Sequence, residues 1–210
     1  NIMRFYRYQG QITVPDTNAA ITNGTFPSGI TDWDDRSTGG AGNQISHDAT
    51  NGRLTLETNG TAADDIGWAE QDVAVSAANQ NKEHVLKFQV IGAPGDRIEL
   101  RIGTSSTGSQ ILADSKKEVG YHCVAFTPGA TTFYVQFRNR GNYRDKDVQI
   151  DNVSLIDNAG VEIDTPWPEA ELFDVEGPQS ADVLYLFHDA YPVYKLLRRG
   201  HTTWSLVEVP

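Results

Sequence analysis

Apolar and polar residues alternate along most of this chain, and helical periodicity is almost absent. A period of two is the spacing of a strand that buries one face. Turn-forming Asn, Pro and Gly separate the alternating runs, because glycine supplies positive φ and proline presets a turn corner. Many short strands at this spacing predict an all-β protein, a jelly-roll β-sandwich. The clearest runs are residues 53–57, 85–90, 97–102, 133–138 and 148–155.

The alternation also predicts the core, since one face of each strand points inward. We expect two packing units. The first, a sandwich core, contains Leu54, Leu56, Phe88, Val90, Ile98, Leu100, Val135, Phe137, Ile150 and Val153. The second, built from strands at 183–187, 194–197 and 205–209, contains Val183, Tyr185, Phe187, Leu196 and Trp204. A short helix is expected within residues 165–173, where Pro and Glu stand in the first turn.

Composition narrows the range of partners. The chain has 210 residues and a net charge of −11, with no cluster of Lys and Arg. An acidic surface repels phosphate, so nucleic acid is not an expected partner. No apolar run reaches the roughly 18–20 residues that a membrane-spanning helix needs. Cys123 is the only cysteine, so no internal disulfide forms, and its apolar neighbours predict a small buried thiol.

The sequence carries no recognisable catalytic motif. Adjacent carboxylates occur at Asp34–Asp35 and Asp64–Asp65, but glycoside hydrolysis needs two carboxylates facing each other across a cleft. The five histidines show no metal-ligand spacing, and there is no nucleophile elbow, phosphate-binding glycine loop or CxxC pair. We therefore do not expect an enzyme.

Residues 18–157 resemble the carbohydrate-binding-module superfamily of galactose-binding-like jelly rolls. The resemblance rests on the opening stretch 22–29, followed by Trp33, on residues 70–75, and on the final strand 148–155, in that order. It implies a jelly roll over 18–157 that binds sugar. Trp33, directly after the opening stretch, is expected to pack in the sandwich.

The same resemblance implies a structural calcium that joins the opening stretch to the last strand. Asn23 and Asp151 are the candidate ligands. Thr25 and Pro27 stand where the family commonly has acidic residues, which removes carboxylates that calcium needs. Asp151 can instead cap a turn or bind backbone amides. No cofactor is required beyond this possible metal.

Sugar sites combine aromatic side chains with amide and guanidinium groups. The candidate glycan-binding residues are Trp68, Gln136, Arg138 and Tyr143. Tyr143 falls in a polar loop and is the best exposed aromatic of the set. For Trp68, both a core position and a binding position stay open.

The two ends, residues 1–17 and 158–210, resemble tail or nozzle structural proteins of short-tailed bacteriophages. The resemblance is carried by residues 3–12 and 179–206. It implies a flanking β-hairpin and propeller-like or meander module, incomplete in this chain, into which the jelly roll is inserted. The strands at 11–14 and 161–163 would then pair at the insertion point, and both ends read as cut from a longer polypeptide.

These resemblances give a leading hypothesis and two alternatives. The first is a bacteriophage virion protein whose partners are copies of itself in a ring, neighbouring tail proteins and a host-surface glycan. The second is a carbohydrate-binding module of a bacterial secreted protein, which would not need strands at 179–206. The third is a jelly roll that decorates the virion and binds nothing.

Overall fold

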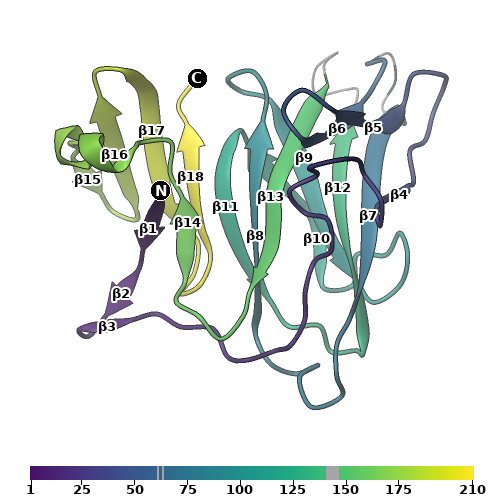
Figure 1. Ribbon diagram of the computed structural model, residues 1–210, viewed down its shortest axis with the longest axis horizontal. Helices are drawn as coiled ribbons and strands as arrows, with labels where there is room; N and C mark the ends of the chain where they lie inside the picture. Colours follow the sequence, from purple (N-terminus) through teal and green to yellow (C-terminus); the bar gives the residue numbers. More distant parts are fainter. Residues whose placement is uncertain (61, 63, 141–146) are drawn as a thin grey trace.

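The protein consists of antiparallel strands in two large sheets, seen here in a computed structural model that describes residues 1–60, 62, 64–140 and 147–210 (Figure 1). The smaller sheet has five strands. In spatial order they are β10 (Leu112–Glu118), β9 (Arg97–Gly103), β12 (Thr132–Arg140), β7 (Ile66–Ala74) and β4 (Asp34–Asp35). The all-β prediction is confirmed, and the architecture is a β-sandwich.

The larger sheet has nine strands, which come from both halves of the chain. Their order is β15 (Gln179–Ser180), β16 (Val183–His188), β17 (Tyr191–Arg198), β18 (Trp204–Glu208), β11 (Gly120–Phe126), β8 (His84–Ile91), β13 (Val148–Ile156), β6 (Arg53–Glu57) and β5 (Gln44–Asp48). No helix in the described part of the chain is long and apolar enough to span a membrane.

The sandwich core lies between the two sheets. All ten side chains expected there from the alternation belong to this one cluster of buried residues, together with Trp33 and Phe26. Trp33 contacts Phe26 and Phe137 with ring centroids 5.8 and 5.7 Å apart. The predicted sandwich core is therefore confirmed.

A second core lies on the outer face of the nine-stranded sheet. Its buried members are Phe5, Ile12, Val14, Val85, Cys123, Ile156, Val161, Ile163, Trp167, Leu186, Tyr194, Leu196 and Leu206. The centre of this sheet is thus apolar on both faces, so that Val85 and Leu86, neighbours on β8, enter different cores. Cys123 is buried in the second core, as its neighbours predict.

The expected membership of this second core is only partly right. Leu196 belongs to it and Trp204 packs against it, but Tyr185 and Phe187 are exposed. On β16 it is Leu186 that points inward. Because both faces of residues 183–187 are apolar, alternation does not decide which face is buried, and the expectation for Tyr185 and Phe187 was wrong.

The segments on either side of the sandwich meet as an insertion into a hairpin requires. Thr13 and Gly160 form an antiparallel bridge, and the N–H of Val14 donates to the carbonyl of Ala159 over 2.8 Å. Beside it, β1 (Ile2–Arg4) pairs with β14 (Glu162–Asp164). The boundaries at residues 17/18 and 157/158 stay predictions.

Of the two modules expected for the C-terminal strands, propeller-like or meander, the structure shows the meander. β16, β17 and β18 form a meander, and β18 pairs with β11, so the meander continues the sandwich sheet. No propeller is present in the described residues. The short helix is a 3₁₀ helix, Glu169–Asp174, and a separate hairpin is formed by β2 (Tyr6–Arg7) and β3 (Gly10–Gln11).

Candidate functional site

The outer face of the five-stranded sheet carries the polar residues of the candidate site, here called the polar face. Along β12, Phe133, Val135 and Phe137 enter the core, so Gln136 and Arg138 point outward. The pairing register of the strands decides which side chains lie next to Arg138 on this face. Arg138 stands opposite Trp68 of β7 on one side and Glu99 of β9 on the other.

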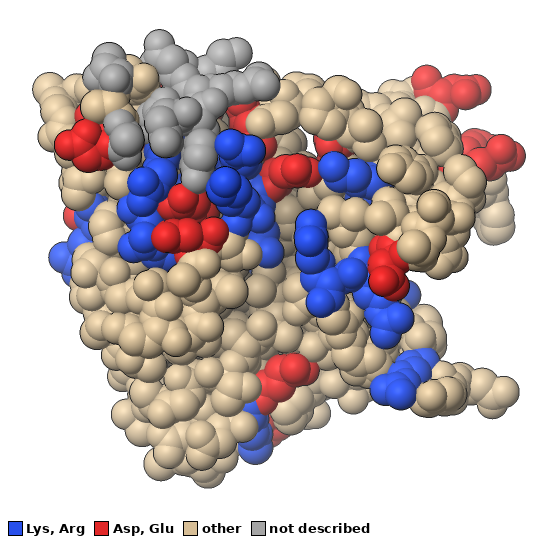
Figure 2. Space-filling view, turned by 180° about the vertical axis from the view of Figure 1, so that it is seen from behind, with Lys and Arg blue, Asp and Glu red and all other residues tan. Residues whose placement is uncertain are grey.

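The structure therefore brings together three of the four candidate glycan-binding residues, Trp68, Gln136 and Arg138. The fourth, Tyr143, lies outside the described residues. Figure 2, which views the molecule from behind, shows acidic and basic side chains gathered on this side of the sandwich, below the residues drawn in grey.

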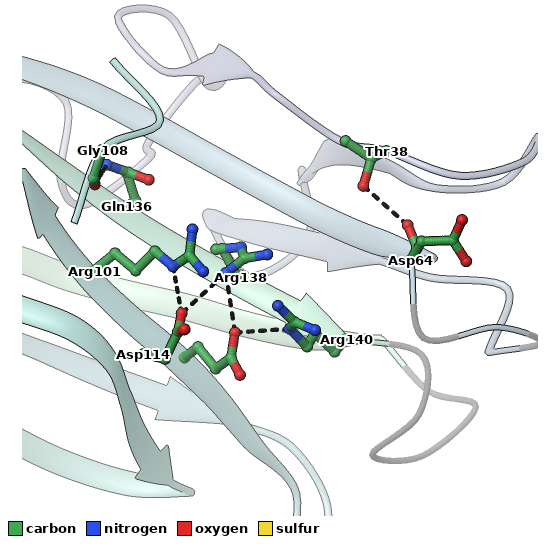
Figure 3. A network of polar contacts seen from close by, with 9 residues as sticks. Thr38, Asp64, Arg101, Gly108, Asp114, Gln136, Arg138 and Arg140 are labelled. Atoms are coloured by element: carbon green, nitrogen blue, oxygen red, sulfur yellow. Dashed lines mark hydrogen bonds and ion pairs between the residues drawn. The ribbon is translucent and has the colours of Figure 1, made fainter. Parts of the chain in front are cut away.

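Ion pairs hold Arg138 in place. Its Nη1 lies 3.1 Å from Glu99 Oε2 and 3.1 Å from Asp114 Oδ1, and Glu99 Oε2 also accepts from Arg140 Nε over 2.9 Å (Figure 3). Arg101 pairs with Asp114, and this hydrogen bond is the main reason that the pKa of Asp114 lies below its usual value. Burial lowers the pKa of Arg138 to about 10, which still leaves it charged at neutral pH.

Trp68 is covered and does not offer an open ring face. The Arg138 guanidinium lies 4.7 Å from the ring centroid, in cation–π geometry, and the residue is only 7% exposed. The sequence left open whether Trp68 lies in the core or in a binding site. In the structure Trp68 is buried, but on the outer face of the sheet and outside the sandwich core.

Three polar atoms on this face have no hydrogen-bond partner among the described residues: Trp68 Nε1, Gln136 Oε1 and Arg138 Nε. Their residues are 7%, 0% and 3% exposed. A buried polar group without a partner costs about 1–3 kcal/mol, so three on neighbouring positions need a physical reason. Together they offer two donors and one acceptor, which is the pattern that hydroxyl groups satisfy, since a hydroxyl both donates and accepts.

A loop, residues 104–111, lies over part of the polar face. Ser106 Oγ donates to Glu70 Oε1 over 2.5 Å, and the N–H of Thr107 donates to Glu70 Oε2 over 2.6 Å. Gln136 Nε2 in turn donates to the carbonyl of Gly108 over 2.7 Å. The loop thus engages Glu70 and Gln136 with a hydroxyl, an amide and a carbonyl.

Sequence reasoning missed several residues of this site: Glu70, Glu99, Arg101 and Asp114. Alternation places Glu99 and Arg101 on an outward face of residues 97–102. It does not say that this strand lies beside β12, because strand order depends on long-range packing.

The opening stretch and the last strand do meet, as the jelly-roll resemblance implies. The N–H of Val153 donates to the carbonyl of Gly24 over 2.8 Å. A Cβ atom on Gly24 would overlap the Val153 carbonyl oxygen, so only glycine allows this approach.

The two candidate calcium ligands near this crossing are otherwise engaged. The Asn23 amide donates to the carbonyls of Gly29 and Thr31 over 3.0 and 2.8 Å, and Asp151 Oδ1 accepts from the N–H of Asn152 over 2.7 Å. Burial raises the pKa of Asp151. Among the described residues, no group of three or more His, Cys, Asp or Glu is placed to hold a metal. Calcium needs six to eight oxygens, so Asn23 and Asp151 do not by themselves fit the ion, and calcium stays a prediction.

No protein-family model matches the chain, and no curated protein matches it either. Among solved structures, the chain is similar to β-sandwiches of the carbohydrate-binding and adhesin type. One is the K3 cleaved adhesin domain of Lys-gingipain from Porphyromonas gingivalis, with 12% identity and a TM-score of 0.46, covering 65% of this chain and 98% of that chain.

Two others are named for their polysaccharide ligands. The mannan-recognising carbohydrate-binding module TmCBM27 is 15% identical with a TM-score of 0.39, covering 76% of this chain and 99% of that chain. The second N-terminal cellulose-binding domain of β-1,4-glucanase C from Cellulomonas fimi is 17% identical with a TM-score of 0.41, covering 73% and 99%.

Proposed function

We propose that this protein is a non-catalytic binding module that recognises a carbohydrate on the polar face. The observation that carries the proposal is the trio of unpartnered atoms on Trp68, Gln136 and Arg138. These atoms stand on adjacent positions of β7 and β12 and are fixed by the sheet and by ion pairs. A rigid set of donors and acceptors is what a sugar site needs to fix the orientation of hydroxyl groups.

The ligand reaches these atoms only after the loop 104–111 lifts. In the closed state Ser106, Thr107 and Gly108 hold Glu70 and Gln136. Sugar hydroxyls offer the same chemistry as these loop groups, so they replace the loop contacts one for one and satisfy the unpartnered atoms in addition.

This exchange implies modest affinity. Most hydrogen bonds gained from the sugar are offset by those lost from the loop, and only the newly satisfied atoms give a net gain. A dissociation constant near 1 mM, about −4 kcal/mol, is in keeping with that balance. Several copies acting together would raise avidity by roughly 10²–10⁴-fold.

The test begins with a glycan array on the whole chain, followed by calorimetry with the best-binding glycan. Gln136→Leu removes the unpartnered acceptor while keeping the size of the side chain. We expect it to weaken binding at least about tenfold, the equivalent of 1.4 kcal/mol. The matched control is Gln89→Leu on β8, in the other sheet, which should bind like the parent protein.

Two results would overturn the proposal. One is the absence of any glycan that binds the chain. The other is equal affinity for the Gln136→Leu and Gln89→Leu proteins, because binding would then not involve the polar face. Circular dichroism and thermal melting of both variants establish that each is folded.

The setting of the module is a further part of the proposal. The resemblance of residues 1–17 and 158–210 to phage tail proteins, with the pairing of Thr13 and Gly160 at the insertion point, supports a module carried on a virion. In that setting its partners are further copies in a ring, neighbouring tail proteins and a host-surface glycan. A module of a bacterial secreted protein is the alternative. Detection of the chain in purified phage particles by mass spectrometry, or only in bacterial culture supernatant, separates the two.

A further inference from the structure

A groove lies between the β2–β3 hairpin and the C-terminal strands, far from the polar face. Its cavity of about 560 Å³ is lined by Tyr6, Arg7, Tyr8, Ile12, Arg198, His201 and Trp204. A second cavity, of about 360 Å³, continues it and shares Arg198 and Trp204. We call this continuous depression the hairpin groove. In Figure 1 the β2–β3 hairpin extends away from the strands at the lower left of the molecule.

Aromatic rings form the walls of the hairpin groove. Tyr6 and Tyr8 are 65% and 86% exposed, which is unusual for side chains of this size. Trp204 is half-buried and held flat, because Phe5 stacks on it with a centroid distance of 4.1 Å and an interplanar angle of 10°. The groove therefore presents one fixed ring and two exposed rings to a ligand.

The charge of the hairpin groove is opposite to that of the whole chain. The net charge of the protein is −11, yet the main cavity is lined by Arg7, Arg198 and His201 and by no carboxylate. Asp182 is the one acidic residue lining the second cavity. No described carboxylate forms an ion pair with Arg7 or Arg198.

The two guanidinium groups lie instead against the aromatic rings. Arg7 is 4.6 Å from the centroid of Tyr8, and Arg198 is 5.7 Å from that of Trp204. These contacts orient the guanidinium planes. Apart from the bond that Arg7 Nη2 donates to the Tyr8 hydroxyl over 3.3 Å, neither guanidinium donates a hydrogen bond to a described residue. A guanidinium in this state is suited to a carboxylate, which it binds through two parallel hydrogen bonds.

We propose that the hairpin groove binds an acidic oligosaccharide, one whose sugar rings bear carboxylate groups. The exposed rings of Tyr6 and Tyr8 pack against the apolar faces of the sugars, while Arg7 and Arg198 bind their carboxylates. This site is separate from the polar face and does not depend on the function proposed for it.

Nucleic acid fits the groove less well, although aromatic rings and Arg also occur in sites for single strands. Affinity for a phosphate backbone comes from many simultaneous cation contacts. The groove supplies Arg7 and Arg198, since Arg4 of the second cavity is already paired with Glu162, and the acidic remainder of the chain repels a long polyanion.

The experiment is a calorimetric titration of the whole chain at low salt with three probes: trigalacturonate, sialyllactose and a chondroitin tetrasaccharide. We expect at least one to bind, and its carboxyl-methyl-ester form to lose binding. Arg198→Met should weaken binding at least about tenfold, and Tyr8→Ala should weaken it as well. The matched control is Arg199→Met, because Arg199 neighbours Arg198 but does not line the groove.

The proposal is overturned if none of the three acidic sugars binds, or if Arg199→Met weakens binding as much as Arg198→Met. It is also overturned if oligo(dT) or an oligoglutamate peptide binds more tightly than every acidic sugar, since the groove would then belong to nucleic acid or to an acidic protein segment.

Discussion

His122 is a buried histidine at the junction of β11 and β18, and its burial makes stability depend on pH. Its Nδ1 lies 2.9 Å from Ser205 Oγ, and its Nε2 lies 2.8 Å from the carbonyl oxygen of Glu118. A carbonyl only accepts, so Nε2 carries the proton of the neutral ring and Nδ1 accepts from the Ser205 hydroxyl. Burial, with a smaller contribution from the nearby charge of Lys117, lowers the pKa of His122 to about 3.

The sign of the effect follows from this lowered pKa. In the unfolded chain a histidine has a pKa near 6.5. Below that pH the unfolded chain binds a proton that the folded protein excludes, so the free energy of unfolding falls as the pH drops from about 6.5 toward 3. Above pH 6.5 His122 contributes no pH dependence. At 1.36 kcal/mol per pKa unit, the loss at about pH 4.5 amounts to roughly 2.7 kcal/mol.

The substitution His122→Gln tests this value, because glutamine keeps a donor and an acceptor but does not titrate. Urea unfolding of both proteins is measured between about pH 7.5 and about pH 4.5, and the difference in the free energy of unfolding is plotted against pH. Carboxylates titrate in both proteins and cancel in the difference. Loss of the stacking of His122 on Phe88 adds a constant offset. We expect the advantage of the parent protein to shrink by roughly 2.7 kcal/mol between pH 6.5 and 4.5; two parallel curves would refute the reasoning.

Three further predictions concern the polar face and the second core. Glu99→Gln leaves buried Arg138 with Asp114 as its remaining ion-pair partner, so it should destabilise the protein by about 3 kcal/mol and lower the melting temperature by roughly 6–12 °C; an unchanged melting temperature would show that the pair contributes nothing. Ser106→Ala removes a hydrogen bond that closes the loop, so it should tighten glycan binding by about threefold to tenfold in calorimetry; weaker binding would mean that the loop is part of the site. Burial raises the pKa of Cys123 to about 12, so its thiol should react with a disulfide reagent only at the rate of unfolding, and rapid labelling of the native protein would contradict this.

The sequence predicted the strands and the sandwich core well because both depend on local alternation. Leu54, Phe88 and Phe137 each stand between two polar residues, and all three are buried in the first core. The prediction failed at Tyr185 and Phe187, where the neighbouring positions are also apolar. Hydrophobic pattern alone cannot choose a face there, and packing of the meander against the second core decides it.

The sequence predicted only part of the candidate site, because local alternation places residues of one strand but not their neighbours on other strands. Gln136 and Arg138 lie two residues apart on β12, so their common face follows from the sequence. Their partners Trp68 and Glu99 come from strands on either side, and that order is set by the register of the whole sheet. The same register places the Arg138 guanidinium over the Trp68 ring. The sequence alone therefore could not show whether the Trp68 ring is exposed or covered.

The pairing of the C-terminal strands with the sandwich sheet was not predicted from the sequence. An open strand edge invites pairing with another strand, and in residues 158–210 one such edge is paired within the chain, since β18 pairs with β11 of the sandwich. The two hydrophobic clusters are separate, as predicted, yet one hydrogen-bonded sheet runs through both. The pattern of apolar side chains predicts the two clusters. It does not predict which distant strands pair through their backbones.

The most direct test of glycan binding on the polar face is the indole N–H signal of Trp68 in nitrogen-15 NMR spectra, followed during titration with the best glycan from the array. Trp68 Nε1 has no partner in the free protein, whereas Trp33 Nε1 donates to Asn23 and Trp204 Nε1 donates to His201. A Trp68→Phe variant assigns the signal. We expect the Trp68 signal to shift and to saturate with the calorimetric dissociation constant, while the Trp33 signal stays in place. A glycan that binds without moving the Trp68 signal would show that the polar face is not the binding site.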